Sequence, residues 1–478
     1  MRKLLPYILA FISFSVHAQS IDRYFERIRN NDAELVAFLS QMPKGGDLHN
    51  HYSGSVYAET YISYVVAQDY FINKNTLEVV KAPPKTGYED WARFSDLAKI
   101  KKLDTYKQLL MQKWSVKDYN GVSYPSDKQF FETFAAFGIA NETQGRLDTG
   151  ILELKNRAKA EHISYIETMF IGIRSKIPDL NDHIILNQLE HDQSIHDEAN
   201  TTVLLNELYK YFIDNKASAY AAEHNEQIAQ MHSRLHIDDE SFTMRYMNYV
   251  SRAGDPVTIF KNMVLSFESA DKSSLVVGVN IVAPEDGEVS MRDYWLHMQM
   301  FRYLHSKYPD VKYSMHAGEL TLGLVKPEEL TWHINEAVRV AGASRIGHGV
   351  DMAYERKPYE LLQYMADNKV AIEINLYSNE FILKVKGDDH PFKLYKDFKV
   401  PIVISSDDAG ILRSNMIHQF ELLARRYKYV SYQDIKHYVY NSIDYSFIKE
   451  DAVKKKLKAQ LDTDFRKFEK EVEVVYGE

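Results

Sequence analysis

The stretch MPKGGDLHNHYSGS, residues 42–55, carries two histidines separated by one residue, His49 and His51. Side chains on a β-strand alternate between its two faces, so both imidazoles would point to the same side. Neutral imidazoles on one face can share a single divalent metal ion, and zinc accepts them well. Such a pair is equally typical of an ordinary surface strand. The rest of the chain therefore has to supply a third ligand, a carboxylate and an acid or base.

From residue 42 onwards, short apolar runs rich in β-branched residues alternate with longer helical patterns, which is typical of βα units around a parallel sheet. The pattern predicts an α/β fold, a (β/α)₈ barrel of the TIM type. A doubly wound open sheet is the alternative, but no glycine-rich phosphate loop follows an expected strand. The expected strands are Gly46–His51, Ile163–Ile171, Phe242–Val250, Leu275–Val282, Lys312–His316, Arg345–His348, Val370–Asn375 and Pro401–Ser406, and the expected helices include Met291–Tyr308, Thr331–Ala341 and Tyr359–Asn368.

The length of 478 residues fits a single large barrel domain, residues 19–478, with the barrel proper at about 42–446. More than a hundred residues separate the first expected strand from the second. We expect part of them, about 57–125, to form an insertion that caps the barrel mouth, because loops after the strands build the active site of this fold. Extra helices are expected at about 21–40 and 450–475, packed on the barrel or on a partner subunit.

The first residues are typical of a secretory signal peptide, residues 1–18. Arg2 and Lys3 precede an apolar run from Leu4 to Val16, and the sequence Val16-His17-Ala18 fits a cleavage site. The run is too short to span a bilayer comfortably, and a buried N-terminal helix is the alternative. We expect a protein exported to the periplasm or secreted, without a membrane anchor. The chain has no cysteine, so its core and a bound metal have to stabilise it without disulfides.

The charge balance argues against a nucleic-acid partner. The formal net charge is −9, and no dense run of lysine and arginine of the kind that neutralises phosphates is present. The nearest candidate, Lys454-Lys-Lys-Leu-Lys, is typical of the solvated face of a helix. We therefore expect no nucleic-acid partner.

Polar residues follow several expected strands. The fifth strand ends in His316-Ala-Gly-Glu319, the sixth in Gly347-His348-Gly349 and the eighth in Ser405-Ser-Asp407-Asp408. Each group has an ordinary alternative, such as a hydrogen-bonded structural histidine or a helix cap. In a barrel, however, the carboxyl ends of all strands meet at one mouth, so these groups and His49 and His51 should converge.

Together these residues predict a mononuclear zinc site. His49, His51, His316 and Asp407 would bind one Zn²⁺ per chain and leave a position for water, whose pKa zinc lowers to about 7. Glu319, with a pKa raised by burial, could deliver a proton as general acid. His348 could orient the nucleophile or stabilise charge on it. The stretch 279–286 after the fourth strand offers no lysine for a bridged pair of metal ions, which favours a single ion.

These motifs, in this order, resemble the adenosine deaminase family, and within it the secreted, growth-factor-like branch. The resemblance runs from about residue 42 to about 446 and includes Ser378-Asn379 and His390-Pro391. It implies that water activated by zinc adds to C6 of adenosine, that Glu319 protonates N1 and that Asp408 contacts N7. Loss of ammonia then gives inosine, a reaction of purine salvage, and 2′-deoxyadenosine is an expected further substrate.

The chain departs from the family pattern near the sugar site. Ser53 stands where many relatives have an aspartate, Ala283 stands where they have a glycine, and Asn375-Leu-Tyr replaces a stretch that contains Cys-Pro. These differences leave the sugar preference open. The alternatives are a zinc amidohydrolase acting on adenine, AMP or a modified adenosine, and a non-catalytic nucleoside-binding or signalling relative. The sequence also leaves a homodimer open.

Overall fold

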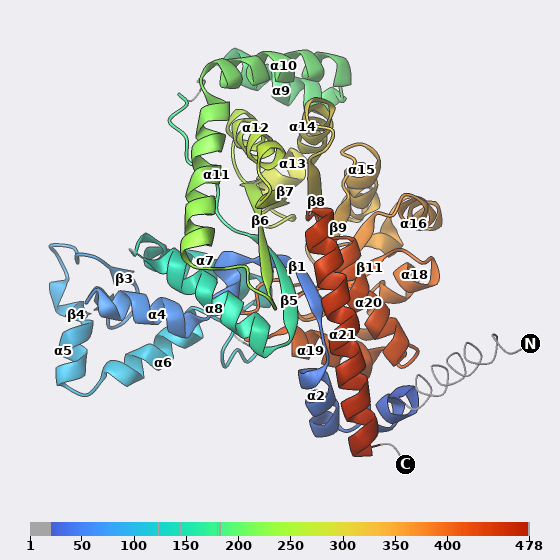
Figure 1. The fold of residues 1–478 in the computed structure, drawn as a ribbon. Coiled ribbons are helices and arrows are strands. Elements are labelled where there is room, and N and C mark those ends of the chain that lie inside the picture. Colours follow the sequence, from blue (N-terminus) through green and yellow to red (C-terminus); the bar gives the residue numbers. More distant parts are fainter. Residues whose placement is uncertain (1–20, 123, 144, 179, 181–182, 477–478) are drawn as a thin grey trace, which may run out of the picture.

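The protein is an α/β barrel. The computed structural model describes residues 21–476 except 123, 144, 179 and 181–182 (Figure 1). In this part of the chain, eight strands form one parallel sheet in chain order, with helices around it. This confirms the predicted TIM barrel, and every expected strand is present to within two residues at each end. The strands are β1 Gly45–His51, β5 Ile163–Met169, β6 Thr243–Ser251, β7 Val276–Val282, β8 Lys312–Ala317, β9 Arg345–His348, β10 Ala371–Ile374 and β11 Ile402–Ile404.

The sheet closes between its first and last strands, just where the barrel mouth begins. The backbone N–H of His51 donates to Asp407 O at 3.2 Å, and the N–H of Asp407 donates to His49 O at 2.9 Å. Asn50 and Asp407 accordingly form an isolated parallel bridge. An open doubly wound sheet has no such contact between its edges. The closure brings the ends of β1 and β11 together.

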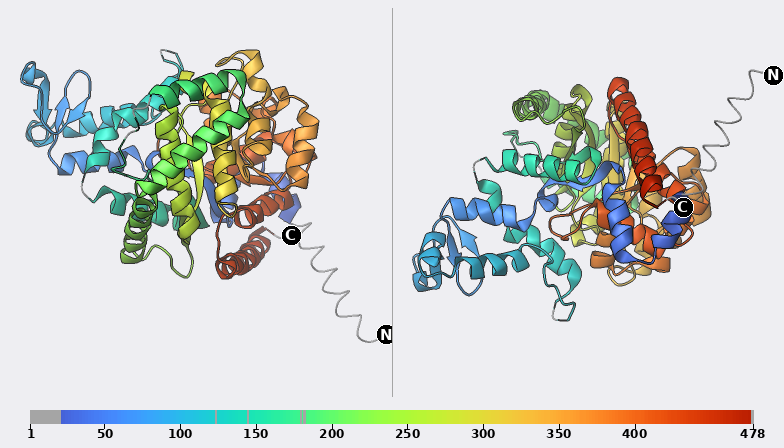
Figure 2. Two further views of the ribbon diagram at one scale, coloured as in Figure 1. Left: turned by 90° about the horizontal axis from the view of Figure 1, so that it is seen from above. Right: turned by 60° about the horizontal axis from the view of Figure 1, so that its bottom comes forward.

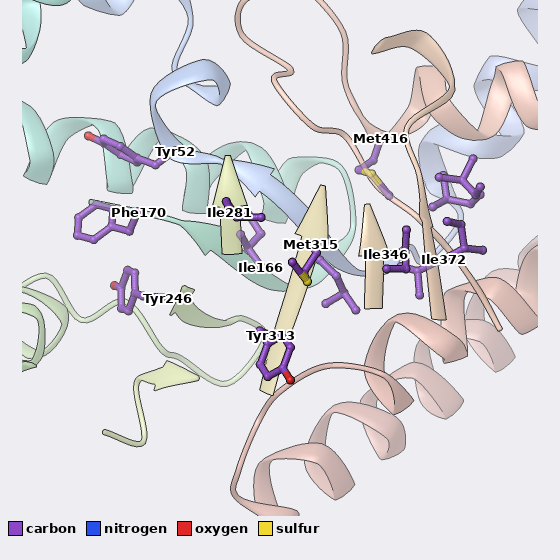
Figure 3. Packing of buried hydrophobic residues seen from close by; sticks show 14 of the residues in the cluster. Tyr52, Ile166, Phe170, Tyr246, Ile281, Tyr313, Met315, Ile346, Ile372 and Met416 are labelled. Atoms are coloured by element: carbon purple, nitrogen blue, oxygen red, sulfur yellow. The ribbon is translucent and has the colours of Figure 1, made fainter. Parts of the chain in front are cut away.

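The two faces of the sheet differ in chemistry. Ile281, Met315, Ile346 and Ile372 lie in one register row across β7, β8, β9 and β10 and pack in the apolar cluster of Figure 3. The next row contains His316, paired with Gly347, and Glu373, paired with the same glycine. Because side chains alternate along a strand, this polar row faces the opposite side, the barrel interior. At this level of the barrel, polar side chains therefore face the interior, and apolar side chains face the surrounding helices.

A long excursion separates β1 from β5. It forms a small antiparallel sheet of β2 Phe71–Asn73, β3 Val79–Val80 and β4 Trp91–Arg93 together with helices. Figures 1 and 2 show this sheet, α5 and α6 projecting away from the barrel as an arm. The next helix, α7, returns to the barrel and packs against α17. The helices of this excursion are α3 Tyr52–Ser55, α4 Ala58–Ala67, α5 Phe94–Lys99, α6 Leu103–Lys113, α7 Ser126–Ala136 and α8 Arg146–Ala160. The barrel helix α17, Leu376–Leu383, follows β10.

A further excursion, between β5 and β6, is not among the expected elements. Helices α9 His183–Ile195, α10 Glu198–Asp214 and α11 Ala217–Arg234 pack against α12 Pro256–Lys272. The amphipathic pattern of these helices is present in the sequence. A standard βα unit, however, gives reason to expect only one helix between two strands. The helices expected at 291–308, 331–341 and 359–368 are present as α14, α15 and α16, and further barrel helices lie before and after them. Their bounds are α13 Glu288–Arg292, α14 Tyr294–Lys307, α15 His333–Arg339, α16 Pro358–Asp367, α18 Phe392–Asp397, α19 Met416–Arg426 and α20 Tyr432–Asp444.

Helices at both ends of the described chain pack beside the barrel. Residues 21–28 and α2 Asp32–Gln41 are helical, and Asn31 caps α2 by accepting from the N–H of Glu34 at 3.3 Å. The C-terminal helix α21, Asp451–Tyr476, lies next to α2 (Figure 1), where Phe38 and Phe468 have ring centroids 5.0 Å apart. The expected signal peptide, residues 1–18, lies outside the described residues. Among the helices that are described, none is long and apolar enough to cross a membrane.

Candidate metal centre and active site

The predicted ligands meet at the barrel mouth. His49 and His51 end β1, His316 lies in β8, and Asp407 follows β11. One ligand atom from each of these residues lies within 4.8 Å of all the others. Nε2 of His51 is 3.1 Å from Nε2 of His316 and 3.3 Å from Oδ1 of Asp407. The structure thus brings the four residues together as one donor set.

Residues behind the cluster orient its imidazoles. Nδ1 of His49 is 2.7 Å from Oε2 of Glu373, and Nδ1 of His316 is 2.9 Å from Oδ1 of Asn280. Both partners can accept a hydrogen bond from the ring, which leaves Nε2 unprotonated and free to bind a metal. Nε2 of His49 is buried without a hydrogen-bond partner. An orphaned buried nitrogen of this kind fits a metal ligand.

The charges of the cluster also favour a cation. Burial lowers the pKa of His51 to about 4 and that of His316 well below its usual value, so both rings are neutral. Burial disfavours a charge on His49 too, but Asp407 and Glu373 outweigh it and raise the pKa of His49 to about 10, so these carboxylates stabilise positive charge at this position. His49 in turn keeps the pKa of Asp407 low in spite of its burial. A carboxylate facing imidazoles at this distance is suited to zinc.

The backbone takes a left-handed turn at several residues of the mouth. His348 has a φ of 70°, Asp407 a φ of 59° and Ala283 a φ of 90°. Residues other than glycine seldom adopt these angles, and where they do the surrounding fold has to hold them. Here the turns direct the side chains after β9 and β11 into the mouth.

Glu319 lies close to the cluster as a buried carboxyl group. Burial, with Asp407 and Glu285 nearby, raises the pKa of Glu319 well above its usual value, which favours the protonated form of this carboxyl group. Its backbone is held by Glu285, whose carboxylate accepts from the N–H of Gly318 at 3.1 Å and from that of Glu319 at 2.8 Å. The same carboxylate accepts from Nδ1 of His333 at 2.6 Å. The geometry therefore presents a proton donor on a rigid loop.

Asp408 also lies in the mouth and lines the same cavity as Glu319. Burial and the adjacent Asp407 raise the pKa of Asp408 well above its usual value, and its Oδ1 is buried without a partner. The carboxyl group lies directly against Gly54, where a Cβ atom would come within 1.5 Å of Oδ1. Only glycine leaves room at this position. A protonated Asp408 can donate a hydrogen bond to a ring nitrogen of a ligand.

These groups share one cavity of about 380 Å³. Apolar and aromatic side chains form most of its wall, and the described residues that line it include neither lysine nor arginine. The aromatic wall comes from α7, which directly follows the expected cap range 57–125. The lining residues are His51, Ser53, Phe130, Phe131, Phe134, Met169, Tyr249, Val282, Ala283, Pro284, His316, Glu319, His348, Ile382, Asp407 and Asp408.

The C-terminal half of the barrel, which contains part of this site, is similar to known deaminases. The model for adenosine deaminase matches residues 236–464. An adenosine deaminase of Clostridium kluyveri is 31% identical over 143 residues, 30% of this chain and 38% of that protein. Residues 236–464 are therefore similar to adenosine deaminases. The chain matches only about two-fifths of the length of the first curated relatives.

Solved structures of deaminases share the whole barrel. An adenine deaminase of Arthrobacter aurescens aligns over 89% of this chain and 99% of its own, with a TM-score of 0.54 and 16% identity. The N6-methyl-AMP deaminase of Arabidopsis thaliana aligns over 90% and 98%, with a TM-score of 0.55 and 16% identity. A cog1816 amidohydrolase from Burkhoderia ambifaria, solved with bound Zn, aligns over 92% and 94%, with a TM-score of 0.53 and 15% identity. At such identities the likeness concerns the fold.

The structure shows further residues that support the site and that the sequence analysis did not name as functional. The matched stretch contains Glu319, His348, Asp407 and Asp408 but begins after His49 and His51, which join it only through the closure of the barrel. The missed supporting residues are the following buried groups: Glu167, Asn280, Glu285, His333, Arg345 and Glu373.

The largest missed network lies inside the barrel below the metal cluster. Arg345 donates to Oε1 of Glu167 at 2.5 Å and also to Glu373, which holds His49. Burial opposes ionisation of Glu373, but Arg345 and His49 lower the pKa of this carboxyl to about 2. The sequence signal for this network was Glu373 in the otherwise apolar strand β10. A buried charge needs a partner of opposite charge, so this glutamate indicated a buried cation nearby.

Proposed function

We propose that this protein is a zinc-dependent hydrolase that converts adenosine and 2′-deoxyadenosine to the inosine nucleosides and ammonia in purine salvage. One observation carries the proposal. A cavity of about 380 Å³ is lined by three members of the metal cluster and by Glu319 and Asp408, two carboxyl groups whose pKa values burial raises. Hydrolytic removal of an aromatic amino group needs a nucleophile at carbon and a proton at the ring nitrogen, and these are the groups provided.

Each residue has a role that its environment supports. Zinc held by His49, His51, His316 and Asp407 would act as a Lewis acid and lower the pKa of water. Glu319 would donate its proton to N1 of the purine, because burial keeps this carboxyl group neutral until a base is offered. Asp408 would donate a hydrogen bond to N7, which is an acceptor. The phenylalanines of α7 would cover the ring and exclude water.

The cavity favours a nucleoside over a nucleotide. A phosphate needs cationic or backbone N–H partners, yet the described lining residues include neither lysine nor arginine. AMP and its N6-methyl derivative are therefore expected to be poor substrates, although a solved relative acts on the latter. A cavity of this size exceeds the need of a bare purine and leaves room for a sugar. Ser53 and Tyr249 are the lining hydroxyls available to it.

A substrate panel tests the proposal directly. The absorbance change of adenosine on conversion to inosine should appear with zinc-loaded protein and disappear after removal of the metal with a chelator. Adenosine and deoxyadenosine should exceed adenine, AMP and N6-methyl-AMP in kcat/KM. Absence of turnover of every compound by metal-loaded protein would contradict the proposal and favour the non-catalytic alternative. Metal analysis of the purified protein identifies the ion.

We also infer that the protein is exported and belongs to the secreted, growth-factor-like branch of the family. The support is the signal-peptide pattern of residues 1–18 and the family motifs of the sequence. N-terminal sequencing of the protein from its native host should begin after Ala18, and fractionation should recover it outside the cytoplasm. A mature chain that retains Met1 would contradict export. Size-exclusion chromatography with light scattering tests whether the protein forms the homodimer that the sequence leaves open.

A further inference from the structure

A line of buried hydrogen bonds begins behind α17 and ends at His348. Its first member is His390, in the loop before α18, with only 2% of its surface exposed. The backbone N–H of Phe392 donates to Nδ1 of His390 at 3.1 Å. A ring nitrogen that accepts a hydrogen bond carries no proton, and burial lowers the pKa of His390 to about 3. The neutral ring therefore holds its proton on Nε2.

The next member is Asn379, on α17. Nε2 of His390 lies 3.1 Å from Oδ1 of Asn379 and donates to it. This bond sets the orientation of the amide, because only the oxygen can accept. The amide nitrogen then faces His348, whose Nδ1 lies 2.9 Å away. Asn375, one helical turn earlier, places its own Nδ2 at 3.5 Å from the same Nδ1.

The remaining neighbours of His348 agree with this direction. Oε1 of Glu319 is 3.6 Å from Nδ1, beyond hydrogen-bond distance. Nε2 of His348 lies 3.9 Å from Oδ2 of Asp407, on the side of the metal cluster. With Nδ1 accepting from an amide, the proton of the neutral ring has to be on Nε2.

We propose that Asn379 and His390 are positioning residues that hold His348 in the tautomer with its proton on Nε2, directed at the metal cluster. A donor in this place can stabilise negative charge on an oxygen beside the metal ligands, whereas it cannot accept a proton from it. A histidine at this place could act either as a base that accepts a proton or as a hydrogen-bond donor. The tautomer assigned here makes His348 a hydrogen-bond donor. The catalytic consequence rests on the proposed deaminase function, but the tautomer is a property of the protein without substrate.

Nitrogen NMR of the histidine rings tests the tautomer. The full-length protein is labelled with ¹⁵N-histidine and measured metal-free and zinc-loaded, and His348→Gln assigns the ring. The wild-type spectra should show a protonated Nε2 and an unprotonated Nδ1 at His348 in both states. A proton on Nδ1 would overturn the proposal, whatever the variants do. The readout does not depend on turnover, so a failure of the proposed function remains distinguishable.

Matched variants test the two positioning residues. Asn379→Leu and His390→Leu should give a mixture of tautomers at His348, because the directed donor is lost. His390→Gln keeps an N–H for Oδ1 of Asn379 and should keep the wild-type tautomer. With adenosine, both leucine variants should lose kcat by between about 10²- and 10⁴-fold, with KM and zinc content little changed. His390→Gln should stay within several-fold of wild type. An unchanged tautomer and kcat in both leucine variants would overturn the assignment.

Discussion

The carboxyl groups at the barrel mouth fall into two sets with opposite environments. On the metal side, Asp407 and Glu373 are kept ionised by His49 and Arg345, which lower the pKa of both carboxyls despite their burial. On the other side, around α15, Glu319 and Glu355 have raised pKa values, mainly because burial disfavours their charge. The first set therefore favours cation binding, and Glu319 of the second set is suited to proton transfer.

Two buried glutamates support the two sides in different ways. Glu373 is paired with a permanent cation, Arg345, and orients the ring of His49. Glu285 is paired with His333 and holds the backbone of Glu319. If the comparison is right, substitutions on one side should change metal binding, and substitutions on the other side should change turnover.

The largest effect is expected from Glu319→Gln. The amide is nearly isosteric with the acid but has no proton to deliver to N1, so kcat for adenosine should fall by about 10²-fold or more. The zinc content should equal that of wild type, because Glu319 is not in the ligand set. Steady-state kinetics and metal analysis measure the two quantities. Comparable activity in this variant would contradict the role of Glu319.

Glu373→Gln should act on the metal side. The amide binds His49 more weakly and leaves Arg345 with Glu167 alone, so zinc affinity should fall by about 10- to 100-fold. Titration against a competing chelator measures this change, and saturating zinc should restore most of the activity. Loss of turnover with unaltered zinc affinity would contradict the assignment of Glu373 to metal binding.

Glu285→Gln is the matched change on the other side. One of the two carboxylate oxygens that accept from the loop N–H groups of Gly318 and Glu319 becomes an NH₂ group, which cannot accept. We expect kcat to fall by about 10-fold, since positioning of the acid is impaired but the acid remains. Zinc affinity, measured with the same chelator, should stay at the wild-type value. A weakened metal site would show that the two sides are coupled.

The smallest effect concerns Glu355, which accepts from the N–H of Ile334 at 2.6 Å. Burial raises its pKa from 4.5 to about 7 in the folded protein. The folded state therefore binds more protons than the unfolded state between these values, and this contribution to stability is present at acid pH and is lost as the pH rises through about 7. Glu355→Gln removes it.

The test of Glu355 is a comparison of unfolding at two pH values. The difference in thermal midpoint between Glu355→Gln and wild type should move in favour of the variant from pH 5 to pH 8, by the equivalent of about 1–3 kcal/mol. Comparing both proteins at the same pH cancels the contribution of the metal ligands. A difference that is independent of pH would contradict the raised pKa.

Much of the fold could be predicted because its pattern is local. The β-branched strands and the helices between them are visible in short windows, and the spacing of His49 and His51 places both on one face. The excursion of α9–α11 was missed, since nothing in a βα pattern states how many helices follow a strand. The supporting contacts were missed for a different reason. Glu373 and His49 are 324 residues apart, so no local pattern relates them.

The amino-acid sequence was sufficient to establish which groups can do chemistry, because donor types and strand ends depend on residue identity and local periodicity. It could name His316, Glu319, His348 and Asp407 as a candidate set before any contact was known. Their states were decided by the folded barrel. Whether a carboxyl keeps its proton, and which nitrogen of His348 carries one, depends on burial and on partners such as Asn379. These quantities arise only when distant segments exclude water together.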